Sequence, residues 1–408
     1  MTVPQTYKTE SGLFHLTLNS YLSFTVGFHD WTFRITPLRL LMLLTAAAAG
    51  CIMLVRFVVG LHPPITNLND EYPWGLWKGW AVFAGVALAG GGYGTAFLVH
   101  ILHIKKLEPF ARRTLLTSLL GYILLLLGLF LEIGRWWNFW RPFVDWGHAS
   151  PLFEVFWCVT IYTIIQCLEL AEIITEKVFK FLHCIFTFIF PAVVICGVMV
   201  PSMHQSTLGA IYLLMEGRLT PLWWSPIIFL FFLLSSLMVG PAMAMLESAI
   251  AYFTYGHKTP LPSMRLLARI GGGIMLVYLV LRLGDLYLRG QIPVLADAAQ
   301  HLFTPDNIEG QICLGEIALG VLLPILIVFS PLGSTYIGLV LFGIFGTAGV
   351  FINRMDVVVV GMVHDSGYWY FPTVMEWIVC FGFASIGLLA YLFLVENFNI
   401  LNEPEHHG

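Results

Sequence analysis

Ten apolar segments, each about 20 residues long or longer, occupy most of this chain. A helix needs about 20 consecutive apolar residues to cross the hydrocarbon layer of a membrane. The sequence therefore predicts an all-α integral membrane protein with about ten transmembrane helices. The second and sixth segments are long, which indicates tilt or extension beyond the bilayer. The predicted spans are 38–61, 75–103, 113–134, 152–175, 181–200, 222–254, 265–288, 311–330, 333–352 and 374–396.

The composition excludes a soluble globular fold. Of the 408 residues, 58% are hydrophobic and 11% are charged, whereas a soluble domain carries about a quarter charged residues. The net charge is −4 and no block is rich in Lys and Arg, so nucleic acid is not expected as a partner. The seven cysteines are scattered without a C-x-x-C motif. Neither an iron–sulfur cluster nor a bound metal ion is therefore expected in this chain.

Lysine and arginine predict how the spans are oriented. With the N-terminus in the cytoplasm, twelve of these residues fall on inner segments and five on outer loops. Positive residues favour the cytoplasmic side, so both termini are expected in the cytoplasm. The outer loops are also the longer ones, so the working surface is expected outside. The five outer residues are Arg135, Arg141, Arg218, Arg289 and Arg354.

A faint internal repeat predicts two four-helix bundles, built from spans 2–5 and spans 6–9. The third span ends with "LEIGR" (131–135) and the seventh with "LRLGDLYLR" (281–289). Each places an acid and an arginine three residues apart, with a glycine between them, near the outer face. Parallel repeats are a known membrane architecture. The predicted division is a cytoplasmic or interfacial segment (1–37), a first flanking helix (38–61), a first bundle (75–200), a second bundle (222–352), a last flanking helix (374–396) and a cytoplasmic tail (397–408).

Ionisable side chains inside the spans are informative, because each is costly unless it faces a polar interior. One interpretation is a proton path through the protein. Arg282 and Asp285 have a second interpretation as an i, i+3 ion pair, and Glu247 and Glu316 as partners in hydrogen bonds to a neighbouring helix. Glu376 follows a proline and is predicted to cap the last helix. The predicted proton path comprises His100, Tyr122, Glu169, Glu247, Arg282, Asp285 and Glu316.

The placement of the histidines argues against a haem in this chain. A b-type haem needs two histidines that face each other at one depth. His100, His103 and His183, all near the inner face, offer the one intramembrane pairing in the sequence. The outer side has no second pair, as a haem ladder across the membrane would need.

Charged and aromatic residues gather at the outer ends of the second, third and fourth spans. Span two begins "YPWGLWKGW" (72–80), span three ends with Glu132 and Arg135, and span four carries Glu154 one turn from its start. Consecutive antiparallel helices usually neighbour each other, so these ends are expected to converge. An aromatic belt explains the tryptophans but not the acids, cations and histidine at the same level.

This mixture suits a flat lipophilic redox ligand such as a quinone. Aromatic walls hold a ring, a cation polarises a carbonyl oxygen, and carboxylates or an imidazole transfer protons. The alternative is an aromatic belt with structural ion pairs, including one between Glu132 and Arg135. The expected catalytic residues are Glu132, Glu154, His148 and Arg135, and the expected pocket residues are Trp74, Trp77, Lys78, Tyr93, Trp136, Trp140 and Asp145.

Several of these segments resemble the NrfD/PsrC family of integral membrane subunits. The likeness is carried by "DEYPWGLWKGW" (70–80), "ALAGGGYGTAFLVH" (87–100), "LEIGRWWNFW" (131–140), "PSMHQSTLGAIYLL" (201–214) and "FINR" (351–354). The chain is most similar to the ten-helix branch, which includes the membrane subunits of periplasmic nickel–iron hydrogenases and of the menaquinone reductase (Qrc) complex. The order and spacing of the segments, more than any one of them, carry the resemblance.

The resemblance implies two four-helix bundles and no haem or iron–sulfur cluster in this chain. It implies a ferredoxin-like iron–sulfur partner on the periplasmic face and a further catalytic subunit of molybdopterin, hydrogenase or multihaem cytochrome type. A quinone such as menaquinone would bind near the outer ends of the first bundle. In eight-helix members a histidine and an asparagine of an early helix contact the quinone, and these do not align here. The family motifs fall on Trp74, Trp77, Glu132, Arg135, Glu154 and His204.

The sequence thus predicts a quinone-reactive subunit of a respiratory oxidoreductase complex. Electrons would pass between a periplasmic iron–sulfur subunit and quinone, with proton uptake or release. Three alternatives stay open: a secondary transporter or proton antiporter, a b-type cytochrome, and a membrane anchor for an external enzyme.

Overall fold

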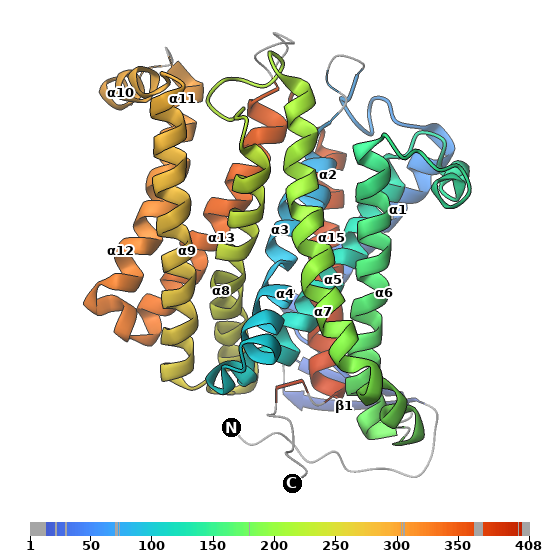
Figure 1. Cartoon of the computed structure of the whole chain (residues 1–408). Coiled ribbons are helices and arrows are strands. Elements are labelled where there is room, and N and C mark those ends of the chain that lie inside the picture. The colour runs from blue at the N-terminus through green and yellow to red at the C-terminus, as the bar shows by residue number, and fades with distance from the viewer. Residues whose placement is uncertain are drawn as a thin grey trace.

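The computed structural model describes residues 14–401 except 21–22, 29–30, 70–71, 73, 179, 303, 305–306, 363–369 and 399. Ten helical segments of the described chain are long and apolar enough to cross a membrane. Figure 1 shows them as near-parallel columns, with α10 and α11 at one end and the strand β1 at the opposite end. The predicted all-α membrane fold is therefore confirmed. Most of the predicted C-terminal tail (397–408) lies outside the described residues.

The first half of the chain supplies five spans. The second of them is a composite, in which α-helical turns alternate with π-helical turns. The elements are α1 (Pro37–Val59), then α2 (Leu76–Lys78), η1 (Gly79–Gly85), α3 (Val86–Ala89), α4 (Gly91–Ala96) and η2 (Phe97–Ile101), then η3 (Lys105–Leu107) with α5 (Glu108–Glu132), α6 (Pro151–Val178), and α7 (Lys180–Ala210) with η6 (Ile211–Met215).

The second half supplies the other five spans and a short helix on the outer side. Its elements are α8 (Ile228–Tyr255), α9 (Leu261–Leu288), α10 (Ile292–Gln300), then α11 (Ile308–Gly315) with η8 (Glu316–Leu322) and α12 (Leu323–Phe329), then η9 (Pro331–Ser334), α13 (Tyr336–Met355) with η10 (Asp356–Val360), and α15 (Val374–Asn397).

The helix contacts close two groups of four spans, as predicted. In the first, α4 contacts α5 and α7, and α6 lies between α5 and α7. In the second, α9 and α13 both contact α8 and α12. The groups meet where α8 packs on α3, α4 and α7, and α1 packs along α15 at the side of the first group. Glycines allow the closest approaches: a Cβ added at Gly349 would lie 2.2 Å from the Cα of Gly320.

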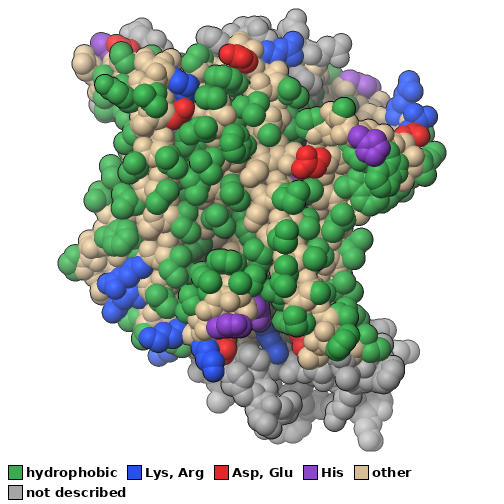
Figure 2. All heavy atoms as spheres, viewed as in Figure 1, with side chains coloured by type: hydrophobic (Ala, Val, Ile, Leu, Met, Phe, Trp, Pro, Cys, Tyr) green, Lys and Arg blue, Asp and Glu red, His purple; other side chains and the backbone are tan. Residues whose placement is uncertain are grey.

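Apolar side chains cover the middle of the molecule. Figure 2 shows hydrophobic side chains across the central part of this face, with most charged side chains towards its two ends. Large residues of the spans such as Phe188, Phe253 and Leu319 are well exposed. This distribution is the one a lipid solvent requires.

The N-terminal segment forms a small sheet that the sequence analysis did not predict. Strands β1 (Phe14–Ser20), β2 (Ser23–Phe28) and β3 (Trp31–Ile35) pair antiparallel in the order β1-β2-β3. The ring of Trp31 stacks on Phe393 of α15, with 5.7 Å between the centroids. The side chain of Asn397 bonds both the N–H and the C=O of Thr32, each at 2.9 Å. The sheet is thus tied to the inner end of α15.

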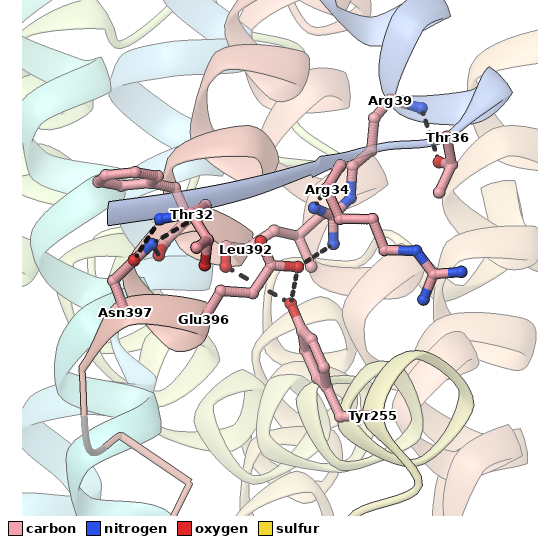
Figure 3. A network of polar contacts seen from close by, with 9 residues as sticks. Thr32, Arg34, Thr36, Arg39, Tyr255, Leu392, Glu396 and Asn397 are labelled. Carbon is pink, nitrogen blue, oxygen red and sulfur yellow. Dashed lines mark hydrogen bonds and ion pairs between the residues drawn. The ribbon is translucent and has the colours of Figure 1, made fainter. Parts of the chain in front are cut away.

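A buried ion pair strengthens this attachment (Figure 3). Arg39 of α1 lies 2.6 Å from the Oε1 atom of Glu396 in α15, and Arg39 also donates to the carbonyl of Arg34 at 2.7 Å. The hydroxyl of Tyr255 in α8 donates to the same Glu396 oxygen at 3.3 Å. The contacts therefore fix the inner ends of α1, α8 and α15 to one another.

One residue in the orientation count was placed wrongly. Arg354 was assigned to an outer loop, but it lies in the last turn of α13 and is fully buried. By the same test, Arg39 and Arg113, counted as inner residues, are buried within α1 and α5. Without these three residues, ten positive residues remain inside and four outside, so the bias is kept. The orientation itself stays a prediction.

Candidate functional site

An ion pair joins the outer ends of the second and third spans. The Nζ atom of Lys78 lies 3.1 Å from the Oε2 atom of Glu132, with the two side chains 23% and 5% exposed. Lys78 is the last residue of α2 and Glu132 the last residue of α5, so antiparallel packing brings them to one depth. The ammonium also lies 5.4 Å from the ring centroid of Trp74. The predicted convergence of these three residues is observed.

The alternative pairing of Glu132 with Arg135 is not formed. Arg135 is exposed, and no ion pair joins it to Glu132 in the part of the chain that the structure describes. Instead Arg56 of α1, only 1% exposed, interacts electrostatically with Glu132 and donates to the carbonyl of Ile133 at 2.6 Å. Arg56 is an ionisable residue inside a span to which no role was assigned from the sequence. A single arginine near the outer end of an apolar span was the signal that pointed to it.

Glu376 caps α15, as predicted. Its backbone N–H donates to Thr373 Oγ1 at 3.1 Å, and its Oε2 accepts from the Thr373 N–H at 2.8 Å, which completes a capping box. The other carboxylate oxygen accepts from Thr66 at 3.1 Å and from the hydroxyl of Tyr370. Burial, and then the adjacent Glu376 carboxylate, raise the pKa of Tyr370, so this phenol stays protonated and donates.

The same cap holds the segment that carries Lys78. The indole N–H of Trp77 donates to the backbone carbonyl of Glu376 at 3.1 Å, and the N–H of Leu76 donates to the Tyr370 hydroxyl at 3.1 Å. Tyr72 and Tyr370 stack with their rings 4.9 Å apart and nearly parallel. The last flanking helix therefore sets the position of Trp77 and of its neighbour Lys78.

Four aromatic rings form a packed group that begins at Trp74, the ring beside Lys78. The ring of Trp74 lies 5.8 Å from those of Phe83 and Tyr212, and the ring of Phe232 lies 5.8 Å from that of Tyr212. We call these four residues the aromatic cluster. They come from spans 2, 5 and 6. Trp74 and Tyr212 meet edge to face, and the other two pairs are tilted. Packed rings of this kind present apolar surface.

The long loop after α5 carries several predicted site residues away from the ion pair. Figure 1 shows this segment projecting sideways beyond α6. Trp136 packs on Phe57 of α1 at 5.3 Å between ring centroids, while Trp140, Asp145 and His148 are exposed. These residues share the outer level with Lys78 but no described contact joins them to it.

Glu154 lies at the outer end of α6 and faces α7. It is exposed, and its Oε1 atom accepts a hydrogen bond from Thr207 at 2.8 Å. Its contacts are therefore with the fifth span rather than with the Lys78–Glu132 pair.

A line of polar side chains continues inward through the first bundle. Tyr122 lies ten residues before Glu132, which is about 15 Å along α5. Its ring lies 4.5 Å from that of Tyr162 and 5.9 Å from that of His204. His204 is fully buried, and within the described structure neither ring nitrogen has a hydrogen-bond partner. Such buried polar atoms are commonly satisfied by ordered water.

The inner part of this line reaches Glu169. Ser118 accepts from Gln166 at 2.5 Å and lies 3.3 Å from the hydroxyl of Tyr162. Glu169 is 6% exposed, lies one turn further in along α6 and packs at Gly197 of α7. We call Glu169, Tyr162, Ser118, Tyr122 and His204 the polar line.

Two other predicted proton-path residues of this region lie apart from the polar line. His100 is exposed and its ring contacts Phe190 at 5.3 Å. Glu247 is buried in α8, where it interacts electrostatically with Arg113.

Tyr93, predicted to shape the pocket, is buried in α4 and its hydroxyl lies 2.5 Å from Ser236 Oγ of α8.

The acids of the second bundle have partners of their own. Glu316 accepts from the indole of Trp223 at 2.9 Å and from Asn353 at 2.7 Å, so its interpretation as a hydrogen-bonding partner is confirmed. The predicted Arg282–Asp285 ion pair is wrong. Asp285 instead pairs with Arg289 one turn later, at 2.5 Å, because that guanidinium can reach along the same helix face.

Arg282 donates to the carbonyl of Leu222 at 2.8 Å.

Among the described residues, no group of three or more His, Cys, Asp or Glu is placed to hold a metal ion.

Comparison with known proteins gives a family match over most of the chain. Residues 64–364 match the family described as polysulphide reductase, NrfD. The matched range omits α1 and α15. Those two helices nevertheless supply Arg56 and Glu376 to the surroundings of the Lys78–Glu132 pair.

Three relatives align with most of the chain. The chain is 28% identical over 366 residues to the probable Ni/Fe-hydrogenase 2 b-type cytochrome subunit of Escherichia coli K12, with 86% of this chain and 89% of that protein covered. It is 27% identical over 360 residues to the menaquinone reductase integral membrane subunit of Nitratidesulfovibrio vulgaris Hildenborough, with 81% and 83% covered. It is 24% identical over 395 residues to the Hdr-like menaquinol oxidoreductase integral membrane subunit of Archaeoglobus fulgidus, with 89% and 93% covered.

Proposed function

This chain belongs to the polysulphide reductase NrfD family, and from that premise we propose that it is the quinone-reactive membrane subunit of a respiratory oxidoreductase complex. Two of the relatives described above carry menaquinone or menaquinol in their names. The complex would exchange electrons between an iron–sulfur subunit on the periplasmic side and menaquinone, or another quinone, in the membrane.

The Lys78–Glu132 pair beside the aromatic cluster is the observation that carries this proposal. Reduction of a quinone consumes two electrons and two protons, and oxidation of the quinol releases them. Lys78 presents an ammonium that can polarise a ring oxygen, and Glu132 presents a carboxylate that can exchange a proton with it. Trp74 and Tyr212 supply apolar walls beside the two charges.

The polar line is the proposed route for protons from the inner side. It starts at Glu169 and reaches Tyr122 and His204, about 15 Å below Glu132 along α5. Water bound at the unpartnered ring nitrogens of His204 would shorten the remaining gap. Protons taken from the cytoplasm and electrons taken from outside would together move charge across the membrane.

Glu154 and His148, two of the three other predicted catalytic residues, suit exchange at the outer surface. Glu154 is exposed and held by Thr207, and His148 is exposed on the long outer loop. The outer loops are also the proposed docking face for the periplasmic iron–sulfur subunit, which a further catalytic subunit would complete. The chain would then sit in a bacterial inner membrane with both termini in the cytoplasm.

The proposal is tested on the complex purified from membranes with its native partners. Oxidation of menadiol, coupled to reduction of an artificial acceptor, measures turnover with a defined quinol. Glu132→Gln and Glu154→Gln should abolish turnover while the subunits still co-purify. Wild-type turnover in both variants would rule out Glu132 and Glu154 as groups that exchange protons with the quinone. A haem spectrum from this chain in the purified complex would favour the cytochrome alternative.

A further inference from the structure

Arg354 of α13 is a fully buried cation that the proposed reaction does not use. Its side chain is 0% exposed. One terminal nitrogen donates to the carbonyl of Phe232 and to Ser235 Oγ, both at 2.7 Å. The guanidinium carbon lies 3.5 Å from the ring centroid of Phe232. Within the described structure, Nε and the other terminal nitrogen have no hydrogen-bond partner.

The charge of Arg354 has no counter-ion in the described part of the chain. No described carboxylate lies within ion-pair distance of the guanidinium. A guanidinium stays protonated in proteins, and an uncompensated charge inside a membrane protein is costly. The titratable groups in electrostatic range are Tyr93, Tyr212, Tyr278 and His204. They carry no negative charge in their ordinary forms, so none of them neutralises the guanidinium.

The position of this charge links it to the proposed quinone site. Phe232, on which the guanidinium rests, is one member of the aromatic cluster. Trp74, another member, lies against the Lys78 ammonium. One cation thus lies against each of two rings of the cluster, and one of the two is fully buried and unpaired.

We propose that Arg354 is a positioning residue that supplies the fixed positive charge that offsets electrons arriving on the quinone. The inference rests on the proposed function. Two electrons from the iron–sulfur partner and two protons convert the quinone to the quinol, and Arg354 neither gives nor takes a proton. Its charge stabilises the ring while negative charge has been added and protons have not yet arrived. The unpaired state of the guanidinium in the free protein is what makes this compensation available.

The proposal is tested with variants that separate the charge of Arg354 from the hydrogen bonds that hold its side chain. Arg354→Gln and Arg354→Met remove the charge, Arg354→Lys keeps it, and Ser235→Ala removes one hydrogen bond to the guanidinium without altering the charge. A unit charge about 10 Å away at an effective dielectric constant of about 20 changes a rate about tenfold. In the menadiol assay, both neutral variants should lose about tenfold in kcat with KM within about twofold of wild type. The lysine variant should recover most of the loss, and Ser235→Ala should stay within about twofold.

Two results would overturn the inference. The first is an Arg354→Lys variant that is as slow as the neutral variants. The second is a Ser235→Ala variant that is as slow as the neutral variants. Either result would mean that the hydrogen bonds of Arg354, and not its charge, account for the loss of turnover. Arg354→Met guards against a glutamine variant that fails to assemble, because methionine needs no buried partner. Glu132→Gln in the same series keeps the two proposals apart. Wild-type turnover there removes the proposed function, whereas a slow Glu132→Gln with a fully active Arg354→Met removes this inference alone.

Discussion

Exchanging the two charges of the Lys78–Glu132 pair separates its electrostatic contribution from its chemical one. The single variants Lys78→Gln and Glu132→Gln each leave one charge behind. The double variant Lys78→Glu with Glu132→Lys restores two opposite charges at the same two positions. If the carboxylate must stand at residue 132, the double variant should recover stability without recovering turnover.

The magnitudes follow from the geometry of the pair. Two unit charges 3.1 Å apart attract by about 5 kcal/mol at an effective dielectric constant of about 20, before desolvation is subtracted. Breaking a fully buried pair costs about 3–5 kcal/mol. Lys78 is 23% exposed and can extend its ammonium towards water, whereas Glu132 is 5% exposed. We therefore expect Glu132→Gln to cost about 1 kcal/mol and Lys78→Gln about 2–3 kcal/mol in free energy of unfolding.

The assay combines thermal unfolding of the purified complex with menadiol turnover on the same preparations. Loss of a positioned acid–base group lowers a rate by about 100-fold or more. Glu132→Gln and the charge exchange should both show this loss. Arg141→Gln is the matched control, because Arg141 is exposed on the loop that follows α5 and makes no ion pair with a described residue. This control variant should leave the turnover rate within about twofold of wild type and the free energy of unfolding close to that of wild type.

Recovery of both stability and turnover in the charge-exchanged protein would refute the chemical assignment, since the pair would then be structural only. Equal destabilisation by the two single variants would refute the argument from side-chain exposure.

Three further predictions concern the surroundings of the site. Thr373→Ala removes half of the capping box and should lower the stability of the complex by about 1 kcal/mol, measured by thermal unfolding. Gly320→Ala places a Cβ 2.5 Å from the Cα of Gly349 and should destabilise by about 2–3 kcal/mol, whereas Gly273→Ala, with open space around its Cβ, should have almost no effect. Glu169→Gln should slow the charge movement that accompanies menadiol oxidation in proteoliposomes, read with a voltage-sensitive dye. An unchanged dye response would exclude Glu169 from the proton route.

Much of the fold could be predicted because it depends on local properties of the chain. Length and apolarity set the ten spans, which required no knowledge of what each helix contacts. The cap at Glu376 was predictable for the same reason, since a carboxylate at a helix start bonds its own backbone. The meeting of Trp74, Lys78 and Glu132 followed from the antiparallel order of consecutive spans. The small N-terminal sheet was missed, because its main support is a distant element, α15.

The sequence by itself determined which segments enter the membrane and which residue types stand at the outer helix ends. Only the tertiary structure decided which charges meet. Glu132 pairs with Lys78 and not with the nearby Arg135, and Arg354 is buried without a counter-ion among the described residues. The physical reason is that a side chain's partner depends on how each helix is rotated about its axis. That rotation is fixed by packing against helices far away in the sequence, as α1 and α15 show at this site.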